Sequence, residues 1–271
     1  MKKFPIALQL YSIRFDMSED FEGTLRKVKE MGYDGVEFAG FFDRTPAQVK
    51  ALCEELDLVP ISAHVGYDDM MKDPEILKDY AEAGCKFVVI PALIGEYTVG
   101  RARHAEVVEG IKMLGKKAAE LGMKLCYHNH DFEFQKVDGE YALDILYREC
   151  PPEVLQTQLD LCWINVGGAN PAEYLRKYAG RAEIVHFKDF TGKKSENMYA
   201  LLGVNEKEKP EVNEAFELRP LGYGLQDVPE LLRAAEDAGC EWIIIEQDTP
   251  SMGKTALECV EMGIDYLRSI M

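Results

Sequence analysis

The segment YHNHDF, residues 127–132, places two imidazole groups, those of His128 and His130, two positions apart. It follows the apolar run MKLC, residues 123–126, which is typical of a buried strand. The acidic residues Asp131 and Glu133 come directly after the histidines. Imidazole and carboxylate groups gathered at one point can bind a divalent cation or transfer protons. The segment therefore predicts that a buried strand ends in a polar site.

Seven of the eight strands that the sequence predicts end in charged or strongly polar residues. In a parallel barrel the carboxyl ends of all strands open at one mouth, where the active sites of such barrels lie. One polar strand end is often structural, but the repetition predicts a single polar site at the mouth. The polar ends are Gln9, Glu37, His64, His128 with His130, Asp160, His186 with Lys188, and Glu246.

The whole chain alternates short apolar runs with segments of helical periodicity, and no change of composition divides it. Eight such units in 271 residues predict an α/β fold, a single-domain (β/α)8 TIM barrel over residues 1–271. An open doubly wound sheet is the alternative, but no GxGxxG or Walker sequence follows any strand. One segment interrupts the rhythm: residues 189–225 form a long loop between strand seven and helix seven. Loops of this length usually carry function or a subunit contact.

The formal net charge of -17 disfavours partners such as nucleic acid or a membrane surface. No segment approaches the about 18–20 apolar residues of a membrane helix. The seven cysteines include no CxxC pair, which is typical of reduced thiols in a cytoplasmic protein.

Asp160, His186, Glu246 and a second glutamate near strand five form a predicted ligand set without thiolates. Such a set suits Mn²⁺, Mg²⁺, Co²⁺ or Zn²⁺. A metal would also relieve the repulsion among crowded carboxylates. The alternative is a metal-free site in which Lys188 and Arg219 provide the counter-charges.

Seven motifs, in order along the chain, resemble the sugar phosphate isomerase/epimerase family, whose fold is the xylose isomerase-like TIM barrel. The motifs are LQLYSIR, GYDGVEFAGFF, ISAHVGYDD, YHNHDFEF, LDLCWINVGG, IVHFKDF and IIIEQD. The resemblance implies a divalent metal, most often Mn²⁺, held by Asp160, His186 and Glu246. Epimerases of the family have a glutamate where this chain has His128. Glu133 is therefore expected as the fourth ligand, with His128 as the alternative.

The resemblance implies a metal-dependent sugar isomerase or epimerase that removes a proton next to a carbonyl. The alternative is a lyase or dehydratase acting on a keto-sugar, 3-keto-glycoside or inosose in the same site, and a non-catalytic sugar-binding barrel is a third reading. The expected partner is a small sugar or sugar derivative, and a homo-oligomer is possible. The residues expected to act in catalysis are Glu246, Glu133, His64 and Lys188. Those expected to bind substrate are Glu37, His128, His130, Trp163 and Arg219.

Overall fold

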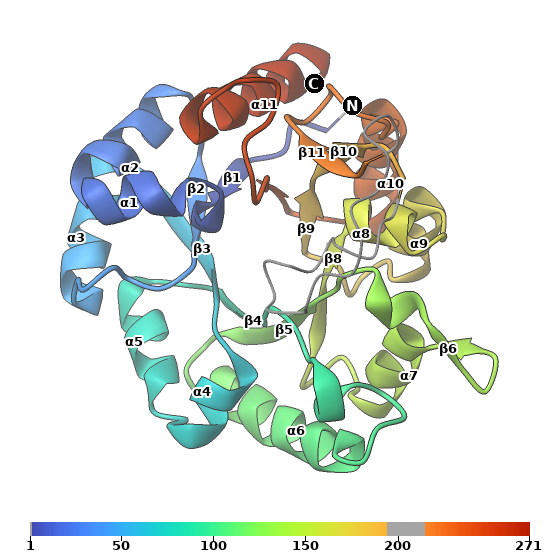
Figure 1. Cartoon of the computed structure of the whole chain (residues 1–271). Coiled ribbons are helices and arrows are strands. Elements are labelled where there is room, and N and C mark those ends of the chain that lie inside the picture. Colours follow the sequence, from blue (N-terminus) through green and yellow to red (C-terminus); the bar gives the residue numbers. More distant parts are fainter. Residues whose placement is uncertain (1, 194–214) are drawn as a thin grey trace.

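The computed structural model describes residues 2–193 and 215–271, and within them eight parallel strands close into a barrel (Figure 1). Around the barrel the strands follow the order β1-β12-β9-β8-β5-β4-β3-β2, and each pairs in parallel with both neighbours. The predicted single-domain TIM barrel is therefore confirmed as a fold. The strands are β1 (Ile6–Gln9), β2 (Gly35–Phe38), β3 (Val59–His64), β4 (Phe87–Ile90), β5 (Lys124–His128), β8 (Gln156–Asp160), β9 (Ile184–Phe187) and β12 (Trp242–Ile245).

Helices form a ring outside the strands (Figure 1). Within the described residues, seven of them lead from one barrel strand to the next, and an eighth follows the last strand: α2 (Phe21–Glu30), α3 (Pro46–Leu56), α5 (Ile76–Ala83), α6 (His104–Glu120), α7 (Ala142–Glu149), α9 (Pro171–Lys177), α10 (Val228–Ala238) and, last, α11 (Ala256–Ile270). Two begin with a capping box, in which Thr45 pairs with Gln48 and Thr255 with Glu258. These reciprocal bonds satisfy amides that the first helical turn leaves free.

Short helices follow several strands at the mouth of the barrel and bring the polar strand ends to their final positions. They are η1 (Leu10–Ile13), α1 (Arg14–Glu19), α4 (Tyr67–Lys72), η2 (Gly95–Tyr97), η3 (Phe132–Phe134) and α8 (Leu161–Val166). A small hairpin of β6 (Lys136–Val137) and β7 (Glu140–Tyr141) lies outside the barrel.

The segment expected as a plain loop, 189–225, contains a second small sheet. In it β10 (Asp189–Thr191) pairs antiparallel with β11 (Glu217–Arg219). The Asp189 carboxylate holds the far end of this segment, because it accepts hydrogen bonds from the amides of Gly222, Gly224 and Gln226 at 2.9–3.0 Å. Residues 194–214 of the expected loop lie outside the described residues.

The barrel strands alternate between an inward and an outward face, and this alternation creates the site. On β9, Val185 and Phe187 belong to the large apolar core, while Ile184 belongs to the small cluster that fills the lower barrel. His186 therefore faces inward above Ile184. The other members of the lower cluster are Ala7, Ile61, Phe87, Val89, Cys126 and Ile244.

Among the described residues, no helix has the length and apolar character required to cross a membrane.

Candidate metal centre and substrate cavity

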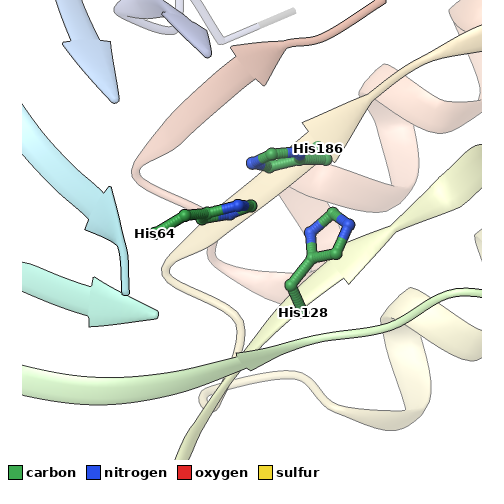
Figure 2. A group of neighbouring side chains, drawn as sticks. All are labelled: His64, His128 and His186. Atoms are coloured by element: carbon green, nitrogen blue, oxygen red, sulfur yellow. The ribbon is translucent and has the colours of Figure 1, made fainter. Parts of the chain in front are cut away.

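Three histidines from three strands converge inside the mouth of the barrel. Figure 2 shows that the rings of His64 (β3), His128 (β5) and His186 (β9) point toward one another. The ring centroids of His64 and His186 lie 5.5 Å apart, and those of His128 and His186 lie 4.7 Å apart. Residues separated by more than a hundred positions thus form one cluster, as the polar strand ends predicted.

Four buried side chains offer ligand atoms within 4.8 Å of one another: His128, Asp160, His186 and Glu246. Asp160 uses one oxygen, Oδ1, to accept the amides of Cys162 and Trp163 at the start of α8. Its other oxygen, Oδ2, is buried and accepts no hydrogen bond from the described residues. A buried carboxylate oxygen without a hydrogen bond is costly, and a metal ion could bind it beside the Lys188 ammonium, which lies 3.4 Å away. Two carboxylates and two imidazoles are a donor set that fits a divalent metal.

Glu133 is not part of this cluster, in contrast to the expectation that it turns back as the fourth ligand. Its Oε1 accepts from the Tyr127 hydroxyl at 2.5 Å and its Oε2 from the amide of His130 at 2.8 Å. It lines a second cavity of about 590 Å³ beside β5. Burial raises the pKa of Glu133 to about 8, against the opposing effect of the Tyr127 hydrogen bond. The strand-five position in the cluster is taken by the alternative, His128.

The histidines differ in charge because their surroundings differ. Burial, reinforced by the neighbouring His186 and His64, holds the pKa of His128 well below its usual range. Burial and the nearby Lys188 lower the pKa of His130 to about 3. Both rings are therefore neutral at physiological pH, as a metal-binding imidazole must be. Burial opposes charge on His186 too, but the carboxylates of Glu37 and Glu246 raise its pKa to about 10. To bind a metal, His186 would therefore have to release a proton.

Lys188 lies among three carboxylates. Its Nζ is 2.8 Å from Glu246 Oε2, 3.1 Å from Asp248 Oδ2 and 3.4 Å from Asp160 Oδ2. Burial opposes its charge, but these acids hold the pKa of Lys188 well above its usual range. It is therefore a buried ammonium in contact with the candidate metal ligands. Asp248 was not predicted for the site, although its position two residues after Glu246 could have indicated it.

A cavity of about 690 Å³ opens above this cluster. The predicted residues that line it are His64, His128, His130, Trp163, Lys188 and Glu246. Trp163 lines the cavity and contacts the rings of His130 and Phe216, whose centroids lie 5.7 and 5.5 Å away. An aromatic ring in this position can pack against the apolar face of a sugar.

Two residues expected to bind substrate do not line the cavity. Arg219 instead pairs with Glu217 on its own strand, β11, at 3.0 Å. Glu37 is completely buried below the histidines. Its carboxylate contacts Gln9 and Ser62, each at 2.6 Å, and is removed from the cavity surface. Glu37 lies one residue before the end of β2, and the residues that reach the cavity here are Ala39 and Gly40, which follow the strand.

The chain belongs to the xylose isomerase-like TIM barrel family, which matches residues 25–270. It is 27% identical to an inosose dehydratase of Geobacillus kaustophilus over 189 residues, 61% of each chain. It is 24% identical to an inosose dehydratase of Clostridium botulinum, with 92% of this chain and 89% of the relative covered.

Solved structures with the same fold have lower identity. A sugar phosphate isomerase/epimerase from Parabacteroides distasonis superposes with a TM-score of 0.77 at 21% identity, covering 99% of this chain and 95% of that one. The IolI protein, solved with a bound zinc atom, gives a TM-score of 0.72 at 15% identity, covering 98% and 97%. These neighbours support the fold, and the zinc-bound example has the same barrel as this chain.

Proposed function

We propose that this protein is a metal-dependent lyase that removes water from a cyclic or open-chain keto-polyol, such as an inosose. The observation that carries the proposal is that the His64 imidazole and the buried Lys188 ammonium line the same cavity, above the candidate metal ligands. Elimination of water needs a base for a C–H proton and an acid for the departing hydroxyl. The similarity to curated inosose dehydratases supports the same reaction class.

The proposed metal ligands are His128, Asp160, His186 and Glu246, with Zn²⁺, Mn²⁺ or Co²⁺ all compatible with their oxygen and nitrogen atoms. When bound, a divalent metal polarises a carbonyl oxygen and so acidifies the neighbouring C–H group. Mn²⁺, which the motifs favoured, is one of these candidates.

His64 is the proposed base. Its Nε2 lies 2.7 Å from Gln158 Oε1 and 3.1 Å from Glu37 Oε1, both of which accept hydrogen bonds. The Nε2 proton is held there, so Nδ1 carries the lone pair that can take a proton. Glu37 raises the pKa of His64 against the opposing effect of burial. A more basic ring is the better acceptor for a C–H proton.

Lys188 is the proposed acid, on the opposite side of the histidine cluster from β3. As His64 takes the proton from the carbon next to the carbonyl, that C–H electron pair forms a carbon–carbon double bond. The C–O bond at the next carbon breaks, and its electron pair leaves with the oxygen. Lys188 donates a proton to this oxygen, so that one molecule of water is released and an unsaturated ketone remains.

We further propose that the substrate is uncharged. Lys188 is the one lysine or arginine among the described residues that line the cavity, and three carboxylates surround it. Among the residues that the structure describes, a phosphate group would meet no free cation in this cavity. The cavity also has a mainly apolar wall, formed by Val65, Ile76, Tyr80, Pro91 and Ala92.

An isomerase or epimerase, the first function suggested by the motifs, is a second candidate because both reactions begin with removal of a proton beside a carbonyl. Asp248 also lines the cavity and offers a second carboxylate that could return a proton to carbon. The non-catalytic sugar-binding barrel is less consistent with a buried cluster of four potential ligands.

One experiment separates these functions. The purified protein, supplied with Zn²⁺ or Mn²⁺, is incubated in D₂O with an inosose and a panel of keto-sugars and followed by NMR. A product that has lost water supports the lyase. Deuterium at the carbon beside the carbonyl with water retained supports the isomerase or epimerase, and no change in any substrate contradicts both.

A further inference from the structure

Glu37 is the centre of a buried polar layer directly below the three histidines. It is 0% exposed, and its carboxylate contacts side chains from four other strands of the barrel. The partners are Gln9 Nε2 at 2.6 Å, Ser62 Oγ at 2.6 Å, His64 Nε2 at 3.1 Å, His186 Nε2 at 2.7 Å and Gln158 Nε2. All of these atoms can donate a hydrogen bond, and a carboxylate can only accept, so the arrangement requires an ionised Glu37.

The carboxylate of Glu37 also fixes the orientation of Gln158. Because Glu37 accepts, the amide of Gln158 must present its Nε2 to it. The Gln158 oxygen, Oε1, then faces the histidines, 2.7 Å from His64 Nε2 and 3.2 Å from His128 Nδ1. Glu37 and Gln158 together therefore offer at least one acceptor to each of the three rings in Figure 2, and His64 faces both residues.

Each histidine consequently has one nitrogen occupied from below and one nitrogen left toward the metal cluster or cavity. His186 gives Nε2 to Glu37, and its Nδ1 lies 2.9 Å from Glu246 Oε2. His128 gives Nδ1 to Gln158, and its Nε2 lies 3.9 Å from Oδ2 of Asp160, which accepts no hydrogen bond from the described residues. An imidazole binds a metal through one nitrogen, and the hydrogen bond made by the other nitrogen selects which one.

We propose that Glu37 is a positioning residue that selects the ligand nitrogens of this site: Nδ1 of His186 directly, and Nε2 of His128 through Gln158. The proposal rests on the metal site of the proposed function. Glu37 does not touch the substrate cavity, so its effect on the reaction passes through the histidines. The layer explains why a buried carboxylate lies on β2, where it neither binds substrate nor joins the ligand set.

The test compares Glu37→Gln with Ser62→Ala. Glu37→Gln keeps the size of the side chain but replaces one acceptor oxygen by an NH₂ group, which faces a set of donors. Ser62→Ala removes a hydrogen bond to the same carboxylate without touching a histidine. We expect Glu37→Gln to weaken Zn²⁺ binding, measured by competition with a chelating dye, by about 10–100-fold. Ser62→Ala should change it by less than about threefold. Equal affinities in parent and Glu37→Gln would overturn the proposal.

A second measurement needs no variant and reports the selected nitrogen itself. The parent protein, labelled with ¹⁵N-histidine and loaded with ¹¹³Cd²⁺, should show coupling of cadmium to Nδ1 of His186 and to Nε2 of His128. Coupling to Nε2 of His186 contradicts the proposal even if Glu37→Gln does not fold.

Failure of the metal site and failure of the positioning role give different results. If the parent binds neither Zn²⁺ nor Cd²⁺, the metal mechanism of the proposed function is wrong. In that case the metal-free parent should still show a low-field proton signal from His186 Nε2–H that Glu37→Gln lacks. Absence of this signal from the parent would overturn the positioning role as well.

Discussion

The ammonium of Lys188 lies 2.8 Å from Oε2 of Glu246, and both side chains are buried at the mouth of the barrel. The contact joins β12, which ends immediately before Glu246, to the residue that follows β9. Each group compensates the cost of burying the other. Asp160 and Asp248 also lie within 3.4 Å of the ammonium, so the charge of Lys188 compensates the negative charge of three carboxylates.

Replacement of Lys188 by methionine should therefore destabilise the metal-free protein by about 3–5 kcal/mol, because three buried carboxylates lose their counter-charge. Chemical denaturation of the metal-free variant measures this cost. Turnover should fall by about 100-fold or more, because the departing hydroxyl loses its acid. Added Zn²⁺ should stabilise Lys188→Met at least as much as it stabilises the parent, since the metal cluster keeps all four of its ligands.

Lys254→Met is the matched control for charge removal. Lys254 pairs with Glu258 at 3.1 Å, but both side chains are more than 40% exposed. Surface pairs of this kind contribute about 0–1 kcal/mol, so stability and turnover should remain close to those of the parent. Equal loss of stability in both lysine variants would contradict a special role for the buried ammonium.

His128, and not Glu133, should be required for metal binding. His128→Ala removes a proposed ligand and should weaken Zn²⁺ binding by more than about 100-fold. Loss of a residue that only orients a ligand has a smaller effect, of about 10–100-fold. Glu133→Gln should change the affinity by less than about threefold, because its carboxylate is bonded to Tyr127 and the His130 amide. Isothermal titration with Zn²⁺ measures the affinity of both variants. If Glu133→Gln lost more affinity than His128→Ala, Glu133 would be the ligand instead of His128.

The difficulty at this position shows how far the sequence could predict the site. Asp160, His186 and Glu246 lie at the ends of consecutive barrel strands. The alternation of strands and helices in the sequence is therefore enough to predict that they lie close together. Glu133 follows β5 by five residues and lies within η3, the short helix that comes after the strand. Its direction depends on a hydrogen bond to the hydroxyl of Tyr127, a residue on the outer face of the same strand. No periodicity in the sequence reports such a contact.

The fold itself could be predicted at the level of the barrel but not at every strand end. The sequence LDLCWINV is largely apolar and so does not show where β8 ends. In the structure, α8 begins directly after Asp160. The signal was Asp160 itself, because a carboxylate that accepts the next amides starts a helix. The β10–β11 sheet was missed because its strands have three residues each, too few to show alternation.

Glu133 also predicts a dependence of stability on pH. Its pKa of about 8 in the folded protein lies well above the value near 4 in an unfolded chain. The folded state therefore keeps a proton that the unfolded state releases. The stability provided by this proton is complete below about pH 4 and is lost as the pH rises toward 8.

Glu133→Gln removes this titration. The free energy of unfolding of the variant, relative to the metal-free parent, should rise by up to about 1.4 kcal/mol per pH unit between about pH 4.5 and 8. Urea denaturation at several pH values measures the slope. The control Glu258→Gln changes an exposed glutamate whose pKa is lowered, mainly by the Thr255 amide, and its relative stability should stay constant from pH 5 to 8. A flat profile for Glu133→Gln would mean that Glu133 is ionised in the folded protein.

The charge of the cavity predicts discrimination against phosphorylated substrates. Among the described residues, four carboxylates, those of Asp69, Glu217, Glu246 and Asp248, line the same cavity as the ammonium of Lys188. A phosphate would enter an anionic region in which these residues offer no free cation. We therefore expect the kcat/KM of a phosphorylated keto-sugar to be at least about tenfold below that of its unphosphorylated form. Because the cavity is partly exposed to solvent, dissolved salt screens this repulsion. The ratio of kcat/KM between the unphosphorylated and the phosphorylated substrate should therefore decrease as ionic strength rises from about 0.01 to 0.5 M, since the screening length falls several-fold over that range. Parallel assays of the two substrates over that range give the ratio, and preference for the phosphorylated form at any ionic strength would contradict an uncharged substrate.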